Sequence, residues 1–357
     1  MKLWRSPLAW TFLASVVLLL GVGGWLLTDP ATSRSDALKT GGLAGGAIVA
    51  LYALWLNDRR RRVEERRQDI ERQRHELEAQ RAEQDRERVA DERFAKAVEL
   101  LGHTADQVRV GALHALAGLA RSRPEYTQTV LDVLCSYLRR PFSYAGSSAS
   151  EPVPDKELEL TVRLTAQRLI TDLLPARDDE APSYDLDLTG ARLEYLDLSG
   201  KRIGGLLLRY ASLHSTTNLN GCRFKGRVYF TAAGTESGRQ VGYFRCRGAV
   251  FESRAWFSGT TFAENVEFTG TTFAGPANFK DAEFAQDAEF TGVAFADSLD
   301  LRRARFAGQT DLRFASLPNS VSLYNTLVRP EKDVRLPEAW DFEELPDGDA
   351  RIVAKAG

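Results

Sequence analysis

A ladder of large apolar residues with a fixed spacing dominates the sequence between Phe251 and Leu323. Its members follow one another at alternating steps of six and five, so the pattern repeats every 11 residues: Phe251, Phe257, Phe262, Phe268, Phe273, Phe279, Phe284, Phe290, Phe295, Leu301, Phe306, Leu312, Leu317 and Leu323. A helix needs apolar residues three or four apart and a flat strand needs alternation, so neither period fits. The spacing predicts a solenoid, in which each coil buries its apolar residues against the next coil.

The same rhythm appears earlier at steps of five, on Leu188, Leu193, Leu198, Ile203, Leu208 and Leu213. The segments 189–193 (TGARL) and 196–200 (LDLSG) resemble the pentapeptide-repeat family, and 251–323 resembles its Phe-rich variant. The resemblance implies a right-handed quadrilateral β-helix, which we expect over 183–325 in about six coils. The spacing is lost near 231–242, which predicts an inserted loop. A Phe-rich globular β domain is the alternative.

Two apolar segments precede any repeat. The first, at about 8–27, is uncharged and long enough for a transmembrane helix, with a signal peptide as the rival interpretation. The second, at about 38–56, contains two overlapping GxxxG spacings, Gly41 with Gly45 and Gly42 with Gly46. Such spacings favour close helix packing, either on the first span or on another copy in a homo-oligomer.

A basic cluster, Arg59, Arg60, Arg61 and Arg62, follows the second apolar segment directly. Under the positive-inside rule it predicts an integral plasma-membrane protein with both termini in the cytoplasm. We also expect these arginines to contact lipid headgroups of the bilayer.

Helical patterns fill the chain from residue 58 to the repeats. Residues 58–92 are almost entirely charged or amide residues without Gly or Pro, which predicts a charged stalk, as a single helix or a coiled coil. Residues 93–182 show amphipathic stripes that weakly resemble a HEAT-type helix pair. The tail, 326–357, is expected to cap the last coil or to form a separate tail. The predicted fold class is therefore multi-domain, α plus β-solenoid, and this order of segments resembles membrane-anchored pentapeptide-repeat proteins of actinobacteria.

No set of residues suggests chemistry. The four histidines form no HExxH motif, the three cysteines form no CxxC pair, and no phosphate-binding glycine motif occurs. We therefore predict no enzyme activity, no cofactor, no metal and no small-molecule substrate.

The charge of the repeats is divided. Residues 201–254 carry ten Lys or Arg and two acids, whereas 262–300 carry eight acids and one Lys. With 22 residues per coil, Glu267, Glu289 and Asp311 fall on one face, where stacked strands lie about 4.8 Å apart. They are either ordinary solvated surface or a docking face for a basic partner.

These features favour a membrane-anchored, non-enzymatic scaffold that presents the solenoid to an unidentified protein partner. One alternative is a DNA-mimicking regulator of a topoisomerase such as gyrase, because some pentapeptide-repeat proteins act in that way. The basic first half and the predicted membrane tether disfavour it, and they disfavour nucleic acid as a partner. A second alternative is an effector that acts on the bilayer itself.

Overall fold

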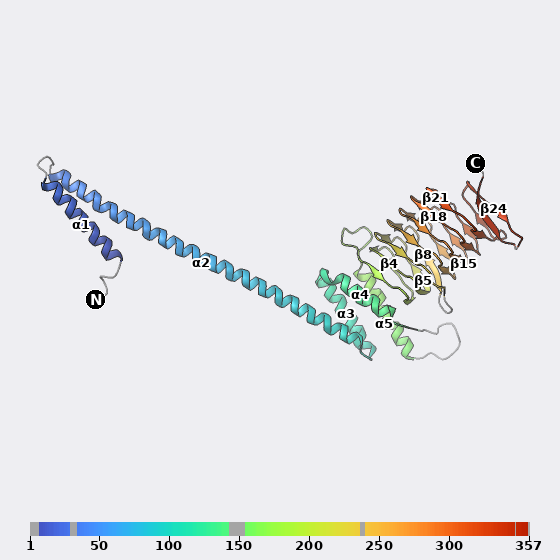
Figure 1. Cartoon of the computed structure of the whole chain (residues 1–357). Helices are drawn as coiled ribbons and strands as arrows, with labels where there is room; N and C mark the ends of the chain where they lie inside the picture. The colour runs from blue at the N-terminus through green and yellow to red at the C-terminus, as the bar shows by residue number, and fades with distance from the viewer. Residues whose placement is uncertain (1–6, 29–33, 143–153, 236–239, 347, 356–357) are drawn as a thin grey trace. The chain divides into compact units, whose positions relative to one another are not determined.

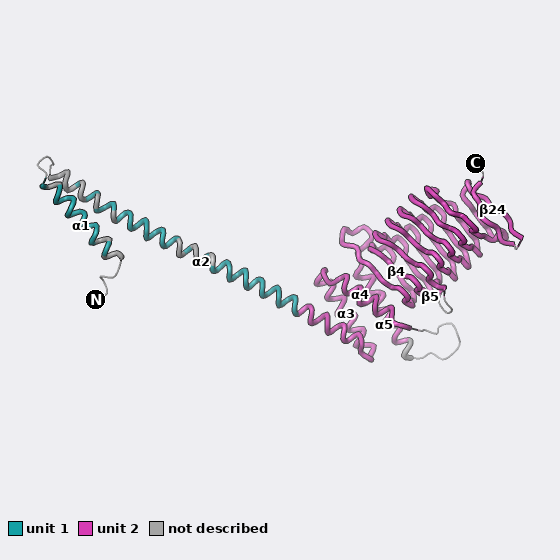
Figure 2. The backbone as a smooth tube through the Cα atoms, in the orientation of Figure 1, with its two compact units in different colours: residues 1–88 teal, residues 89–357 magenta. Residues whose placement is uncertain are grey.

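The computed structural model describes residues 7–28, 34–142, 154–235, 240–346 and 348–355, and its helices precede a β-solenoid (Figure 1). The chain forms two compact units, residues 1–88 and 89–357 (Figure 2). The solenoid expected from the apolar ladder is confirmed and lies entirely in the second unit.

The first unit contains α1 (Pro7–Thr28) and most of α2 (Arg34–Leu101). The Ser15 hydroxyl of α1 donates a hydrogen bond of 2.8 Å to the carbonyl of Gly45 in α2. A side chain at Gly45 would meet Leu19 and Ser15 at 3.3 Å, whereas one at Gly42 or Gly46 would meet nothing. Of the two GxxxG spacings, the one that includes Gly45 therefore packs α2 on α1 within the chain.

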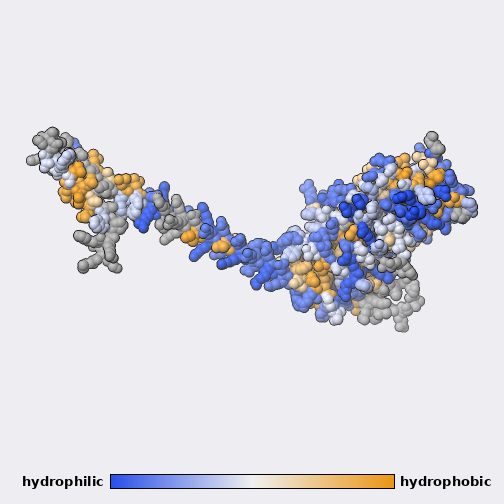
Figure 3. All heavy atoms as spheres, viewed as in Figure 1, coloured by the Kyte–Doolittle hydropathy of each residue, from blue (hydrophilic) through white to orange (hydrophobic). Residues whose placement is uncertain are grey.

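The prediction of two transmembrane helices is wrong. None of the helices in the described ranges combines the length and the apolar content that a bilayer crossing requires, although apolar residues are exposed on α1 and at the beginning of α2 (Figure 3). The expected second span is no separate element, because α2 runs on for 68 residues into the charged segment. The predicted location in the plasma membrane and the predicted cytoplasmic termini depended on these two spans, so these predictions are wrong as well.

Four further helical elements follow the end of α2 in the second unit. They are α3 (Asp106–Ser122), η2 (Pro124–Tyr126), α4 (Thr127–Arg139) and α5 (Pro154–Leu173). Their apolar stripes form one core with the first coil of the solenoid, through residues such as Leu116, Leu134 and Leu169.

The solenoid is built from short parallel strands that pair between successive coils in three sheets. The first sheet contains β1 (Leu186–Asp187), β4 (Leu206–Leu207), β7 (Val228–Tyr229), β10 (Ala255–Trp256), β14 (Ala277–Asn278), β18 (Ser298–Asp300) and β21 (Ser320–Ser322). The third contains β3 (Arg202–Ile203), β6 (Arg223–Phe224), β9 (Val250–Phe251), β13 (Thr272–Phe273) and β17 (Ala294–Phe295). The seven strands of the first sheet make seven coils, one more than expected.

The second sheet has 13 strands and covers two sides of the coils. Its parallel strands are β2 (Arg192–Glu194), β5 (Ser212–Asn218), β8 (Val241–Arg245), β11 (Thr261–Phe262), β12 (Val266–Glu267), β15 (Glu283–Phe284), β16 (Ala288–Glu289), β19 (Arg305–Phe306), β20 (Thr310–Asp311), β22 (Leu327–Val328) and β23 (Val334–Arg335). The coil from Val228 to Ala255 is five residues longer than the next one, from Ala255 to Ala277. The inserted loop expected near 231–242 lies in this longer coil, and its residues 236–239 fall outside the described residues.

Phenylalanine rings stack from coil to coil at the centre of the solenoid. One column runs through Phe224, Phe251, Phe273 and Phe295, with ring centroids 4.8, 4.8 and 5.2 Å apart. Others pair Phe262 with Phe284 at 5.0 Å and Phe284 with Phe306 at 4.6 Å. All ten phenylalanines of the ladder are buried. Leu317 is 49% exposed instead, whereas Leu323 packs partly buried against the core, so the inward pattern is interrupted at Leu317.

Asx turns close many of the corners. An outward Asp or Asn at the end of a strand accepts a hydrogen bond from the backbone N–H two residues later. The structure forms this turn at Asp187, Asp197, Asn218, Asn278, Asp300 and Asp311. For the four aspartates, partial burial raises the pKa, but hydrogen bonds from these turns and nearby polar or basic groups outweigh it. The pKa of each aspartate is therefore lowered.

Acid should destabilise the solenoid through these turns. A carboxyl whose folded pKa is depressed stabilises the fold above its ordinary pKa of about 3.9, and this stability is lost as the pH falls through the folded value. We expect the urea midpoint of the chain to drop between pH 5 and about pH 3. The double variant Asp300→Asn/Asp311→Asn keeps both turns without titrating, so its midpoint should fall less. An equal drop in both proteins would contradict this role.

The helices of the second unit complete the first coil, whose carbonyls have no earlier coil to pair with. Side chains of these helices supply donors on different sides of the first coil. Gln128 donates to the Asp185 carbonyl at 2.9 Å, and Arg163 donates to the Arg192 carbonyl at 3.0 Å. Thr171 donates to the Asp197 carbonyl at 2.7 Å. The segment after α5 adds the Arg177 N–H, which donates to the Gly200 carbonyl at 2.8 Å. The helical elements therefore act as an N-terminal cap.

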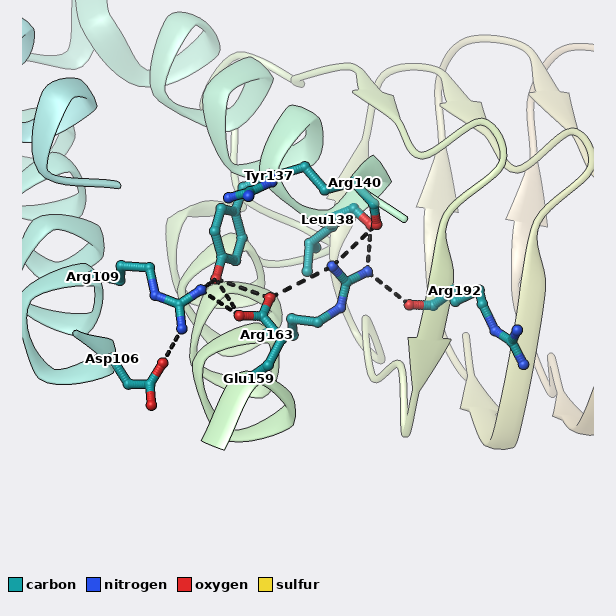
Figure 4. A network of polar contacts seen from close by, with 8 residues as sticks. All are labelled: Asp106, Arg109, Tyr137, Leu138, Arg140, Glu159, Arg163 and Arg192. Carbon is teal, nitrogen blue, oxygen red and sulfur yellow. Dashed lines mark hydrogen bonds and ion pairs between the residues drawn. The ribbon is translucent and has the colours of Figure 1, made fainter. Parts of the chain in front are cut away.

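Arg163 is the centre of this cap (Figure 4). Its side chain is only 2% exposed and also donates to the carbonyls of Leu138 and Arg140. Beside it, Glu159 accepts hydrogen bonds from Arg109 and from Tyr137, and Arg109 also pairs with Asp106. One buried polar network therefore joins α3, α4 and α5 and reaches β2.

An antiparallel hairpin completes the other end. Strands β24 (Trp340–Glu344) and β25 (Ala350–Ala354) pair with each other, and β25 pairs with β22. Trp340 is buried, and its ring contacts Phe314 at a centroid distance of 5.6 Å. The tail therefore lies against the last coils of the solenoid.

Candidate protein-docking surface

The three acidic residues expected to share a face do lie in register. Glu267 pairs with Glu289 and Glu289 pairs with Asp311, in strands β12, β16 and β20. In the same column, Arg245 lies opposite Glu267 in the preceding coil and Arg335 lies opposite Asp311 in the following one. The acidic column is thus flanked by an arginine at each end, which offsets the repulsion between stacked carboxylates.

Glu267 is not available for docking. Its side chain is only 10% exposed, and it accepts a hydrogen bond from the Tyr243 hydroxyl. Arg247 lies 2.8 Å and Arg245 3.4 Å from its carboxylate. These partners neutralise Glu267 and hold it against the coil.

The carboxylate of Asp311 already has partners within the chain. Its carboxylate closes the turn to the Arg313 N–H and forms a short ion pair with the Arg313 side chain. Arg335 approaches the same carboxylate at 3.9 Å. Asp311 therefore has a structural role and contributes only part of its charge to the surface.

Glu289 differs from both. No side-chain hydrogen bond or ion pair reaches it from the part of the chain that the structure describes. It lies in a hollow of about 250 Å³ lined by Asp287, Ala288, Glu289, Gln309, Thr310, Asp311, Asp333 and Arg335, which we call the acidic hollow. An unpaired carboxylate beside three further acids gives this hollow a negative potential that fits a cationic side chain.

The remaining predicted residues are dispersed. Arg59, Arg60 and Arg61 are exposed on α2. The exposure of Arg62 and of Gly41 is not among the described features of this helix. Arg59 lies over the ring of Trp55 at 5.3 Å. Since no spanning helix was found, the predicted lipid contacts of these arginines and the interface between copies have no support here.

No group suited to metal binding occurs in the described ranges, among His, Cys, Asp and Glu side chains. The three cysteines are buried, and burial raises the pKa of the Cys222 thiol to about 12, which suppresses its reactivity.

Sequence reasoning missed the cap residue Arg163 and the partners of Glu267. An available signal for Arg163 was a charged residue directly after Val162, between the apolar positions of α5. Arg245 lies 22 residues before Glu267, so the same count could have placed it opposite that residue, whereas the hydrogen bond from Tyr243 does not follow from the spacing.

Comparison with known proteins gives one match. A family model for pentapeptide repeats, with nine copies, matches residues 268–316. No curated protein and no solved structure matches the chain. The matched residues begin directly after β12, include β13 to β20 and belong to the regular coils of the solenoid described above. Together with the seven-coil β-solenoid, this match shows that the chain carries pentapeptide repeats, over residues 268–316.

Proposed function

We propose that this chain is a non-enzymatic protein-interaction module whose acidic hollow binds a basic segment of a partner protein. The observation that carries the proposal is Glu289, a carboxylate without a partner among the described side chains, placed between acids that are already fixed. A Lys or Arg side chain entering the hollow would gain a charge-assisted hydrogen bond with Glu289.

The rigidity of the solenoid supports binding over turnover. Stacked strands and stacked rings join each coil to the next. Pentapeptide-repeat proteins are generally non-enzymatic. Such a surface loses little conformational freedom when a partner binds, which favours affinity.

The acids of the second half do not form the continuous free negative surface that a DNA mimic would need. Asp281 pairs with Arg303, Asp300 with Arg302, and Asp333 with Arg335. Glu289 keeps a carboxylate without a described partner inside the acidic hollow, and a single site of this kind is better suited to a short basic peptide.

Reversing the charge of Glu289 should abolish partner binding. We expect Glu289→Lys to weaken binding of a fluorescein-labelled peptide of Lys-Ser repeats by at least about tenfold, because a charged hydrogen bond is replaced by repulsion. Fluorescence anisotropy measures the affinity, and cross-linked pull-down from cells identifies which proteins are lost with the same variant.

Glu283→Lys is the matched control. Glu283 is an exposed glutamate of the same coil on another side of the solenoid, and no described side chain forms a hydrogen bond or ion pair with it. It carries the same charge change without touching the acidic hollow. Equal losses in the two variants, or no loss in either, would contradict the assignment.

A further inference from the structure

Early coils carry a second charged surface on the first sheet, remote in sequence from the acidic hollow. Tyr229 and Trp256 are the outward residues of neighbouring strands β7 and β10, in direct register. Arg209, Arg227 and Arg254 flank them. We call these five residues the basic-aromatic patch.

Two of the arginines are held on the aromatic rings. The Arg209 guanidinium lies 4.2 Å from the centroid of the Tyr229 ring, and the Arg254 guanidinium lies 5.3 Å from that of Trp256. The two rings meet edge to face at 5.2 Å. Cation–π attraction at these distances restrains each guanidinium, so both are positioned before any ligand arrives.

These arginines lack acidic partners. The segments 205–210, 226–231 and 253–258, which form this side of three coils, contain no Asp or Glu. No ion pair or side-chain hydrogen bond joins Arg209, Arg227 or Arg254 to another described residue. The arginines of the later coils behave differently, because Arg302, Arg303 and Arg313 each pair with an aspartate.

The spacing of the patch follows from the coils. The carbonyls of Arg227 and Arg254 accept hydrogen bonds from Leu206 and Val228, so the two arginines occupy equivalent positions in neighbouring coils. Adjacent coils lie about 4.8 Å apart. The patch therefore presents positive charge from three successive coils within the reach of one short peptide.

Recognition of single-stranded nucleic acid needs an open ring face on which a base can stack. Here guanidinium groups occupy the ring faces, and Tyr229 is only 6% exposed. Arg209 and Arg254 are partly exposed, and the N–H edge of a guanidinium matches the two oxygens of a carboxylate. We propose that the basic-aromatic patch binds an acidic segment of a partner protein, with carboxylates paired to Arg209 and Arg254.

This surface is independent of the acidic hollow, because it lies on the first sheet, in other coils, and selects the opposite charge. The test uses the purified 357-residue chain and a fluorescein-labelled peptide of five Glu-Ser repeats, with a Gln-Ser peptide as the uncharged reference. We expect the Glu-Ser peptide alone to bind. Arg209→Ala/Arg254→Ala should weaken it at least about tenfold, since two charge-assisted contacts are lost.

Two further variants separate geometry from charge. Arg329→Ala/Lys332→Ala also removes two positive charges, from exposed residues without described side-chain partners, and should leave the affinity unchanged. Arg209→Lys/Arg254→Lys keeps the charge but loses the planar fork, so we expect it to remain several-fold weaker than the wild type. Circular dichroism melting of each variant establishes that the fold is retained.

Several results would overturn the proposal. They are absence of Glu-Ser binding at millimolar peptide, equal weakening by the Arg329/Lys332 control, and full affinity in the lysine variant. Tighter binding of an oligothymidylate than of the Glu-Ser peptide, lost with Arg209→Ala/Arg254→Ala, would instead make the patch a nucleic-acid surface.

Discussion

Replacing Phe284 with aspartate is expected to unfold several coils of the solenoid, the largest effect of any single substitution considered. The Phe284 ring is 1% exposed and stacks between Phe262 and Phe306. An aspartate there would place an unpaired charge among aromatic rings, which costs several kcal/mol, and the coils on both sides depend on that contact. Phe284→Ala, which only leaves a cavity, should cost about 3–5 kcal/mol.

Glu283→Asp provides the matched control, because Glu283 is the adjacent outward residue of the same strand, β15. This substitution places the same aspartate side chain in the same strand but in solvent. We therefore expect the free energy of unfolding to change by no more than about 0.5 kcal/mol. Urea unfolding followed by far-UV circular dichroism measures both. If the two aspartate variants unfold at the same midpoint, the alternation of inward and outward residues in this strand is wrong.

Removal of the Arg163 side chain should have the next largest effect on the stability of the fold. Arg163→Ala leaves the carbonyls of Leu138, Arg140 and Arg192 without this donor and opens a cavity, for an expected loss of about 3 kcal/mol. Arg163→Lys should recover only part of this, because a single ammonium cannot reproduce the guanidinium fork. Burial lowers the pKa of Arg163, but its carbonyl acceptors suit the charged form.

The position along the solenoid at which Arg163→Ala loses stability tests whether the helices act as a cap. Hydrogen exchange in Arg163→Ala should accelerate in the first coil, around β1 and β2, while coils beyond β9 keep their protection. Arg168→Ala is the control, since Arg168 is exposed on the same helix and should change stability by no more than about 0.5 kcal/mol. Exchange that rises evenly along the solenoid would argue against a local capping role.

The sequence predicts the solenoid well because its information is local and repeated. A 22-residue coil places Glu267, Glu289 and Asp311 in one column by counting alone, and the structure has them in register. The partners of those side chains are less predictable from the spacing. The same count places Arg245 opposite Glu267, but Arg335 lies opposite Asp311 two residues beyond the position that the count gives. The hydrogen bond from the Tyr243 hydroxyl to Glu267 does not follow from the spacing either.

Interpretation of the helices from sequence was less successful, for a physical reason. Apolar content suggested a span that stops at residue 56, yet no Gly or Pro occurs between Gly46 and Gly102 to end a helix there. Backbone hydrogen bonding continues wherever no residue interrupts it, so α2 runs to Leu101. The contacts of Arg163 were beyond prediction, because they join α5 to segments far along the chain.

Both ends of the solenoid are closed by elements that fit only the coil they cover. Gln128, Arg163 and Thr171 meet the first coil, and β25 pairs with β22 near the last. Coils between β9 and β19 meet only one another and share the 22-residue register. Duplication or loss of one such unit would leave both closures intact. The solenoid is thus an adjustable spacer, in which each added coil moves the acidic hollow about 4.8 Å further from the basic-aromatic patch.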